Sequence, residues 1–383
     1  MRVAIVCDWL LGTGGAERVI LELHKVFPNA PIYTSQYDKN PKNWYGDKWF
    51  EDADIRTTWL QKLPKPLKKF LPPLRAWVFS RLNLDDYDLV ISSSGAEAKF
   101  VKVRAGTKHI SYIHAPTHYY WARYEEYLKY PGFGKLDFLA RFGLRLLVGP
   151  MRHWDFQAAQ RPDYLIANSN YTKEQIKKYY GRDAVVIHPP VDIERFEVTA
   201  PTFQSGSRLS VGSDKLHKQS RRGFVTAGRQ VLYKKIDLAV KTATQLNAPL
   251  VVIGRGPDHS KLKRMAGRSV IFLTNVSDEE IARRFAEAEA FIFPGVDDFG
   301  IVAVEAMAAG TPVIAYKAGG ALDYVDKTTG IFFNNQTPES LAKAMQEFSK
   351  LVFNHDHIAK QAKKFSPDKF RTKVLQLIKQ LSS

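Results

Sequence analysis

The sequence predicts an α/β protein built from two doubly wound domains, each with a parallel sheet covered by helices on both faces. Its 383 residues exceed what one ordinary hydrophobic core holds, which favours two domains. Short apolar runs alternate with helical patterns in both halves, and this alternation is typical of parallel strands joined by helices. A polar, turn-rich stretch at 199–222 separates the halves and predicts an interdomain linker or a disordered insertion.

The first half, residues 1–198, begins with an apolar run from Arg2 to Cys7 that we expect to be a strand. The run meets Asp8 and a glycine loop, so a strand is favoured over a secretion signal. A helix with apolar residues on one face should follow between Glu17 and Phe27. The further strands expected in this half are 31–34, 89–92, 109–114, 164–168 and 185–188.

The second half, residues 223–364, is a regular Rossmann-like alternation of strands and helices. Its expected strands are 223–227, 249–253, 270–273, 290–293, 312–316 and 330–333. An amphipathic helix is predicted in the final segment, 365–383. Ligands of such sheets bind beyond the carboxyl ends of the strands, so the loops that follow the strands are where we expect the functional residues.

Composition restricts the compartment and the partners. Cys7 is the only cysteine, so no intrachain disulfide can form and a reducing compartment is the simpler assumption. No window reaches the roughly 20 uninterrupted apolar residues that span a bilayer, and we expect a cytoplasmic protein. Lysine and arginine number 56 against 39 acidic residues, a net charge of +17 that attracts polyanions. The sequence has no zinc-finger spacing and no aromatic RNA-binding signature, so phosphorylated substrates or a membrane surface are favoured over nucleic acid.

Two motifs in the first half can carry chemistry. The first strand leads into a loop with Gly14 and Gly15 at a helix start, where backbone N–H groups can bind an anion. A tight turn without a ligand is the alternative, and the loop is not a Walker motif because no Lys-Ser or Lys-Thr follows. His114 ends a strand just before Pro116. A histidine held there can donate or accept a hydrogen bond in a reaction, or can be purely structural.

Basic and glycine residues follow the strands of the second half. Arg229 and Lys234 lie in the loop after the first of these strands and can both reach one diphosphate, unless they are only solvated charges. Gly254 follows the next strand in a compact turn that can approach a nucleotide, and the pair 319–320 is similar.

The segment 292–310 is the most informative part of the sequence. An apolar run ends, a turn presents Asp297 and Asp298, and a small-residue helix opens near Gly300 and carries Glu305. Backbone N–H groups and a positive dipole end beside carboxylates can hold phosphate and sugar hydroxyls together. This pattern predicts a nucleotide-sugar site.

Together these motifs resemble the retaining GT-B glycosyltransferases of family 4, most closely the bacterial mannosyltransferase-like enzymes of surface-polysaccharide assembly. The resemblance runs over nearly the whole chain. The stretches that carry it are 8–10, 14–19, 87–94, 114–116 with Trp121, 179–181, 188–192, 229–237 and 299–310. It implies two Rossmann-like domains that face each other across a cleft, with the C-terminal helix returning to the N-terminal domain.

The resemblance also implies roles for single residues. The first domain would bind the acceptor and the second the donor, with Arg229 and Lys234 on the diphosphate. Glu305 would bind the ribose hydroxyls, and Asp297 takes the first acidic position of the family's Glu-x7-Glu motif, near the donor sugar. His114 would contact the transferred sugar, so the implied catalytic set is His114, Asp297 and Glu305. The other donor contacts that it implies are Gly14, Gly15, Gly254, Asn275, Val276, Asp298, Phe299, Gly300 and Ile301.

Two positions depart from the family pattern. The usual glutamate is Asp297 here, one methylene shorter, so its contact with the sugar is expected to be weaker, bridged by water or supplied by Asp298. The family often has glycine and then an apolar residue or threonine where this chain has Asn275 and Val276. These two are carried over only as contacts to the base.

The reaction implied is front-face transfer with retention, in which the leaving diphosphate helps to deprotonate the acceptor hydroxyl. No cofactor and no metal is implied, because Arg, Lys and helix dipoles would neutralise the diphosphate. A glycosidase needs two carboxylates across the scissile bond, and Asp297 and Glu305 beside phosphate-binding signals fit that geometry poorly.

The sequence therefore predicts transfer of a hexose, mannose from GDP-mannose, to a glycan or a polyprenyl-diphosphate-linked acceptor. The alternatives are a UDP-sugar donor, a non-catalytic nucleotide-sugar binder and a basic nucleic-acid-binding protein. The segment 63–77 interleaves four basic residues, Arg75 among them, with apolar ones. Such a mixture can lie in an anionic lipid interface, and we expect peripheral attachment to the inner face of the membrane; a solvated loop is the alternative.

Overall fold

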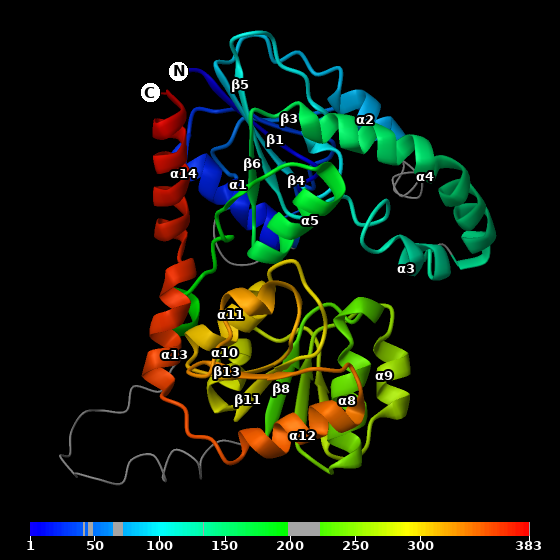
Figure 1. Ribbon diagram of the computed structural model, residues 1–383, viewed down its shortest axis with the longest axis vertical. Coiled ribbons are helices and arrows are strands. Elements are labelled where there is room, and N and C mark those ends of the chain that lie inside the picture. Colours follow the sequence, from blue (N-terminus) through cyan, green and yellow to red (C-terminus); the bar gives the residue numbers. More distant parts are fainter. Residues whose placement is uncertain (41–42, 45–48, 64–71, 133, 198–222, 383) are drawn as a thin grey trace, which may run out of the picture. The chain divides into compact units, whose positions relative to one another are not determined.

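The computed structural model describes residues 1–40, 43–44, 49–63, 72–132, 134–197 and 223–382. The chain divides into two compact units, one of Met1–Pro190 with Phe370–Ser383 and one of Val191–Lys369 (Figure 1). Each unit contains a parallel sheet with helices on both faces, which confirms the predicted fold class. The predicted linker at 199–222 lies outside the described residues.

The described part of the first unit forms one sheet with the parallel strand order β3-β2-β1-β4-β5-β6-β7. Its strands are β1 (Val3–Cys7), β2 (Ile32–Thr34), β3 (Ile55–Thr57), β4 (Leu89–Ser94), β5 (Lys108–Ile113), β6 (Tyr164–Ala167) and β7 (Val185–Val186). Its helices before the linker are α1 (Gly15–Val26), α2 (Pro72–Phe79), α3 (Tyr124–Lys129), α4 (Asp137–Gln160) and α5 (Asn170–Tyr180). Strand β3 is an edge strand that the apolar pattern of the sequence does not predict.

Strand β1 is buried on both faces because side chains alternate across a sheet. Ile5 and Cys7 lie in one apolar cluster with residues of α1, while Ala4 and Val6 lie in another with residues of α2 and α4. Helix α14 (Pro367–Ser382) completes the first cluster, since it buries Phe370, Val374, Leu377 and Ile378 there. The C-terminal amphipathic helix thus packs on the core of the first sheet.

The described part of the second unit forms a parallel sheet of order β10-β9-β8-β11-β12-β13. Its strands are β8 (Phe224–Ala227), β9 (Leu250–Ile253), β10 (Val270–Leu273), β11 (Ala290–Phe293), β12 (Val313–Tyr316) and β13 (Gly330–Phe333). Its helices are α6 (Glu194–Glu197), α8 (Ile236–Gln245), α9 (His259–Met265), α10 (Asp278–Glu287), α11 (Ile301–Ala308), α12 (Pro338–Phe348) and α13 (His355–Ala362). Each strand of this sheet matches a strand expected from the sequence.

The segment expected to contact lipid is only partly described, because 64–71 lie outside the described residues. Trp77 on α2 is 46% exposed, but Arg75 is buried, and its Nε donates to Glu97 Oε2 at 2.8 Å. The prediction that Arg75 lies among surface cations is therefore wrong; its guanidinium neutralises a buried carboxylate. Within the described residues, no helix is both long enough and apolar enough to cross a bilayer.

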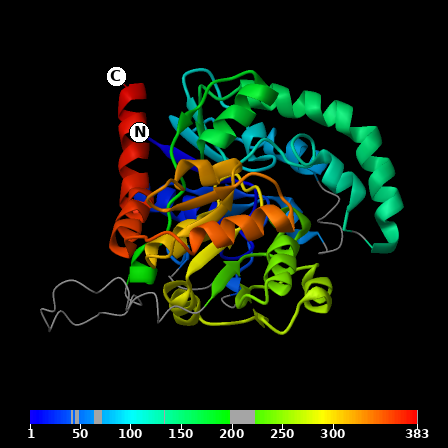
Figure 2. The ribbon, with the colours of Figure 1, turned by 60° about the horizontal axis from the view of Figure 1, so that its bottom comes forward.

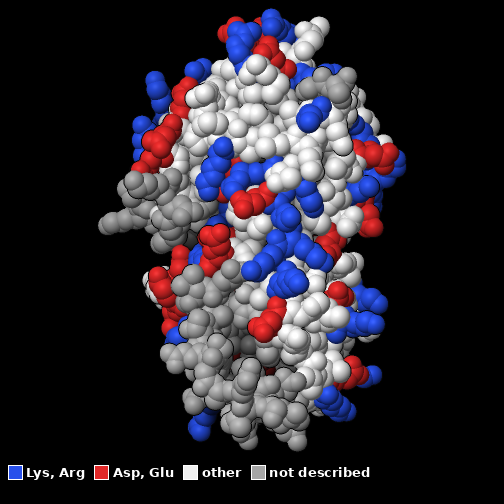
Figure 3. Space-filling view, turned by 90° about the vertical axis from the view of Figure 1, so that its left-hand side faces the viewer, with Lys and Arg blue, Asp and Glu red and all other residues white. Residues whose placement is uncertain are grey.

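Figure 3 shows the charged side chains on one face of the molecule. On the face shown in Figure 3, lysine and arginine side chains are distributed over the molecule and interspersed with acidic ones. Charge alone therefore does not mark one binding site on this face.

Candidate functional site

His114 directly follows β5 and lies half-buried at the carboxyl end of the first sheet. Its backbone N–H donates to the Ser94 carbonyl at 2.9 Å, and its Nε2 lies 2.8 Å from Ser93 Oγ. Its own carbonyl accepts a hydrogen bond from Asn168 Nδ2 at 2.8 Å. The contacts from β4 and from the end of β6 hold the His114 backbone, and Ser93 orients the imidazole, at the sheet edge where ligands of parallel sheets bind.

Asp8, which follows β1, organises the segment beside His114. Its carboxylate accepts the backbone N–H groups of Gly95, Ala96 and Ala98 at 2.8, 3.0 and 2.6 Å. Burial and a neighbouring carboxylate raise the pKa of Asp8 to about 6. A Cβ on Gly95 would lie only 3.7 Å from the Cβ of His114. Asp8 therefore holds the loop against which His114 lies.

The predicted glycine loop stands at the start of α1. Gly14 is the N-cap residue and Gly15 the first helical residue. A Cβ on Gly14 would meet Glu17 Oε2 at 2.5 Å, so the chain's own carboxylate lies beside this helix start. Burial raises the pKa of Glu17 to about 7. An anion bound here would meet Glu17, and the raised pKa lets that carboxyl become neutral at little cost near neutral pH.

An ion pair joins Lys234 and Asp297 in the second unit. Lys234 ends the short helix after β8, and Asp297 lies in the turn after β11. The two loops touch through their backbones: a Cβ on Gly295 would lie 2.7 Å from the Tyr233 carbonyl oxygen. Asp297 is buried, and its Oδ1 has no hydrogen-bond partner among the described residues. A buried carboxylate oxygen without a donor is costly, and a ligand hydroxyl at this position would satisfy it.

The loops after β8 and β9 are joined by glycines and by Gln230. A Cβ on Gly254, whose φ is +115°, would lie 2.4 Å from the Gly228 carbonyl oxygen. Gln230 is fully buried; its Nε2 donates to the Gly254 carbonyl at 2.7 Å, and its Oε1 lies 2.7 Å from His259 Nδ1. Packing between the loops is therefore sufficient reason for glycine at position 254.

Gly300 caps helix α11 with a φ of +91°, in the left-handed region that favours glycine. A Cβ there would meet Phe293 Cζ at 2.6 Å and Tyr324 Oη at 2.7 Å. Phe299 is buried against Tyr324, with ring centroids 5.4 Å apart. The next loop supports this turn closely, because a Cβ on Gly320 would lie 2.3 Å from the Phe299 Cα.

Helix α11 begins at Ile301, and Glu305 lies half-buried on its second turn. The N–H groups at such a helix start lack acceptors within the helix and can bind an anion. Asp298 is half-buried, while Arg229 is exposed in the loop after β8. The start of α11, the Lys234–Asp297 pair and Glu305 thus belong to the β11–α11 turn and the loop packed against it.

Asn275 explains one departure from the family pattern. Its φ is +58°, a left-handed conformation that asparagine adopts more readily than other non-glycine residues. Asn275 is exposed and Val276 half-buried, both between β10 and α10. Asparagine therefore reproduces the backbone conformation for which glycine is the usual choice.

The predicted residues fall into two sets. His114, Gly14 and Gly15 belong to the first unit, and the remaining predicted residues belong to the second. Three supporting side chains were not predicted: Ser93, Gln230 and Tyr324. Serine at a strand end one strand away from His114 was a usable signal for the first. Nothing in the sequence pattern indicated the other two.

Two family models match the chain. Residues 13–195 match the model "Glycosyltransferase Family 4", and residues 213–365 match "Glycosyl transferases group 1". A D-inositol 3-phosphate glycosyltransferase of Streptomyces avermitilis is 27% identical over 51% of this chain and 46% of its own length. A GDP-mannose-dependent monoacylated alpha-(1-6)-phosphatidylinositol monomannoside mannosyltransferase of Corynebacterium glutamicum is 29% identical over 48% of this chain and 52% of its own length. The matches thus span about half of these relatives.

Solved structures share the fold over the whole chain. Sucrose-phosphate synthase from Thermosynechococcus elongatus superposes with a TM-score of 0.70 at 16% identity, covering 100% of this chain and 99% of that one. Anabaena HepE in complex with UDP superposes with a TM-score of 0.66 at 17% identity, covering 99% and 100%. At this identity the likeness establishes a GT-B-type fold and nothing about the ligand.

Proposed function

The chain belongs to the GT-B glycosyltransferases of family 4, and we propose that it transfers a hexose from a nucleotide sugar to a glycan or lipid-linked acceptor. The observation that carries the proposal is the surroundings of Asp297. Its Oδ2 pairs with Lys234, while its buried Oδ1 has no partner among the described residues. A sugar hydroxyl is a neutral donor that would satisfy this oxygen.

The donor would bind at the carboxyl end of the second sheet. Arg229 and Lys234 would meet the diphosphate, together with the N–H groups at the start of α11, and we propose that these groups replace a bound metal. Glu305, on the second turn of the same helix, would accept hydrogen bonds from the ribose hydroxyls. His114 would contact the transferred sugar, in a transfer with retention of configuration.

GDP-mannose is the proposed donor, and the similarity to the GDP-mannose-dependent mannosyltransferase of Corynebacterium glutamicum supports it. The second candidate is a UDP-sugar, which a protein of the same fold could bind at this site. The acceptor is proposed to be a surface glycan or its polyprenyl-diphosphate-linked precursor, reached by peripheral attachment to the membrane.

A thermal-shift screen of nucleotides and nucleotide sugars tests the donor assignment. A ligand that binds only the folded state raises the free energy of unfolding by mass action, by about 2.7 kcal/mol when its concentration is a hundred times its Kd. The melting temperature rises as a consequence. We expect GDP-mannose to shift the melting temperature more than UDP-sugars. A larger shift with a UDP-sugar replaces the donor, and no shift with any nucleotide sugar contradicts the proposed function.

Turnover of the donor separates an enzyme from a non-catalytic binder. We expect His114→Ala and Glu305→Ala to abolish release of the nucleoside diphosphate, while Glu339→Ala, an exposed change on α12, leaves it unchanged. Equal turnover in all four proteins would exclude the proposed roles. Binding without turnover by the unchanged protein would support the non-catalytic alternative.

A further inference from the structure

Helix α4 differs sharply between its two halves, which meet at Pro150. Its second half contributes four buried residues, Met151, Asp155, Ala158 and Ala159. Residues 137–149 are all described, and none of them is buried. In both views of the ribbon this first half extends away from the sheet of its unit, with α3 beside it (Figure 1, Figure 2).

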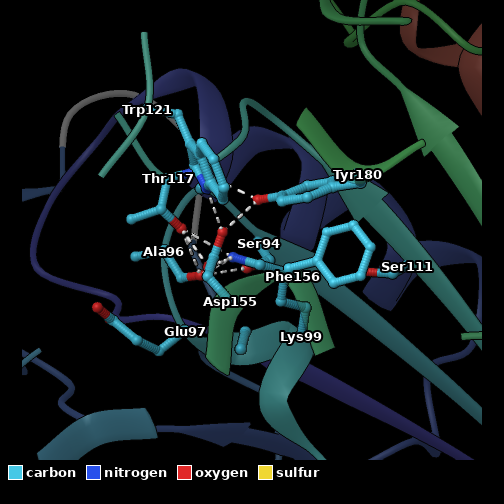
Figure 4. A network of polar contacts seen from close by, with 12 residues as sticks. Ser94, Ala96, Glu97, Lys99, Ser111, Thr117, Trp121, Asp155, Phe156 and Tyr180 are labelled. Carbon is cyan, nitrogen blue, oxygen red and sulfur yellow. Dashed lines mark hydrogen bonds and ion pairs between the residues drawn. The ribbon is translucent and has the colours of Figure 1, made fainter. Parts of the chain in front are cut away.

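The second half is fixed by a buried polar network (Figure 4). The Asp155 carboxylate pairs with Lys99 at 2.7 Å, and both side chains are fully buried. It also accepts hydrogen bonds from Thr117 Oγ1 at 2.8 Å, Trp121 Nε1 at 2.7 Å and Tyr180 Oη at 2.7 Å. These contacts fix the second half of α4 to the rest of the unit. Because the helix continues from this fixed end, the direction of its first half is set as well.

The free half carries a row of large apolar side chains. Phe138, Phe142 and Leu146 are spaced by four, so they lie on one helix face, and they are 63%, 67% and 66% exposed. Leu139 and Leu147 beside them are 51% and 44% exposed. Single exposed apolar residues are ordinary, but a contiguous apolar face indicates an interaction surface. We call Phe138, Phe142 and Leu146 the α4 row.

The charges around the α4 row indicate what covers it. Arg145 is exposed next to the row, and Arg141 borders the same side, where it donates to the carbonyls of Leu128 and Lys129 at 3.1 and 3.3 Å. Asp137 is the one acidic residue of this half of the helix. An apolar face bordered by arginine fits the interface of an anionic bilayer. A second copy of a chain with net charge +17 would be repelled.

We propose that the first half of α4 docks this protein on an anionic lipid surface, with the α4 row in the acyl boundary and Arg145 at the headgroups. The docking proposal rests on the proposed function, and it identifies the segment through which the proposed peripheral attachment to the membrane would occur. Helix α4 lies in the connection between β5, which His114 directly follows, and β6. Docking through it would therefore bring a lipid-linked acceptor to the unit that carries His114.

Flotation of the full chain with vesicles tests the proposal without donor or acceptor. We expect binding to phosphatidylcholine vesicles that contain phosphatidylglycerol, weakened by salt, and little binding to phosphatidylcholine alone. The triple change Phe138→Ser, Phe142→Ser and Leu146→Ser should weaken binding by about a thousandfold, since burying each of the three side chains contributes roughly tenfold. Arg145→Gln should weaken it by about fivefold, and only on anionic vesicles.

Matched controls separate this surface from apolar exposure in general. Ile271, Val352 and Leu375 are 57%, 70% and 49% exposed elsewhere on the molecule, and their triple change to serine should leave vesicle binding unchanged. Lys343→Gln on α12 is the matched control for Arg145, because the Lys343 side chain is 78% exposed. Absence of binding by the unchanged protein, or equal binding by both triple variants, would overturn the proposal.

A dye attached at Phe142→Cys gives a second measurement that changes only one side chain of the α4 row. The natural Cys7 is buried and its pKa is raised by burial, so the introduced thiol would be labelled selectively. We expect the emission to shift to the blue with anionic vesicles, and no shift from a dye at Val352→Cys. An unshifted dye at 142 overturns the docking face, as does vesicle-independent dimerisation that the triple change of the α4 row abolishes. The shift of the melting temperature with nucleotide sugars is measured separately and does not depend on vesicles. Failure of the proposed function can therefore be distinguished from failure of the docking proposal.

Discussion

Breaking the Lys234–Asp297 pair tests both the packing and the proposed donor site. In Asp297→Asn the Lys234 ammonium loses its counter-charge, although its side chain is only 19% exposed and that of Asp297 only 9%. Removing one partner of a buried pair costs about 3–5 kcal/mol. Because the lysine keeps some contact with water, we expect the lower end, about 3 kcal/mol. For a unit of this size that corresponds to a fall in Tm of about 6–12 °C.

The double variant Lys234→Met, Asp297→Asn separates stability from binding. Removing both charges relieves the uncompensated ammonium, so most of the lost stability should return in urea unfolding. Donor affinity, measured by calorimetry, should not return, because the proposed diphosphate and sugar contacts are both gone. Lys234→Met alone and the unchanged protein complete the cycle.

An exposed ion pair of the same unit provides the control. Lys343 and Glu347 are 3.9 Å apart with side chains 78% and 57% exposed, so Glu347→Gln should cost less than about 0.5 kcal/mol. The reasoning is refuted if Asp297→Asn is as mild as Glu347→Gln. It is also refuted, for the donor site, if the double variant binds the nucleotide sugar as tightly as the unchanged protein.

Three further predictions concern stability. Gly300→Ala and Gly106→Ala meet the same left-handed backbone, with φ of +91° and +90°, but only the first Cβ meets atoms within 4 Å. Both should lose about 1–2 kcal/mol of unfolding free energy to strain, and Gly300→Ala about 1–3 kcal/mol more to overpacking; equal losses would contradict the packing argument. Asp155→Asn leaves a fully buried lysine uncompensated and should cost about 3–5 kcal/mol, against less than about 0.5 kcal/mol for Asp137→Asn, whose partner is 3.9 Å away at the surface; chemical denaturation compares them. Burial lowers the pKa of His109 from 6.5 to about 4. The neutral imidazole of His109 therefore contributes about 3 kcal/mol to the free energy of unfolding above pH 6.5, and this contribution is lost as the pH falls through 4. The difference in unfolding free energy between the unchanged protein and His109→Gln isolates this effect, and a pH-independent difference would contradict it.

Much of the fold could be predicted because the apolar runs of parallel strands are short and bounded by turns. The strands of the second sheet were all predicted from such runs, as was β1. Strand β3 was not predicted, because Arg56 and Thr57 are exposed at the sheet edge and leave no apolar run. At the other edge, β7 has only two residues, where a strand of four was expected. Edge strands need less burial, so their pattern is weaker.

The site was predictable as residue types in loops, but not as contacts. The sequence places His114 at a strand end, yet its pairing with Ser93 depends on the β4–β5 register. Likewise Lys234 and Asp297 are far apart in sequence and meet only because β8 and β11 are neighbours in the sheet. The buried position of Arg75 was not predicted because its partner is distant in sequence. Arg75 lies on α2, whereas Glu97 follows β4.

The glycines of the second unit change how its motifs should be weighed. A side chain at Gly254 would clash with the backbone of Gly228. Side chains at Gly295 and Gly320 would likewise clash with the backbones of the neighbouring loops. Each of these glycines is explained by backbone packing, so none of them requires a ligand. The buried Oδ1 of Asp297 is different, because packing leaves it without a donor among the described residues. The case for a sugar site in this unit therefore rests on its polar atoms, while the glycines explain how the loops that hold those atoms come close enough to pair.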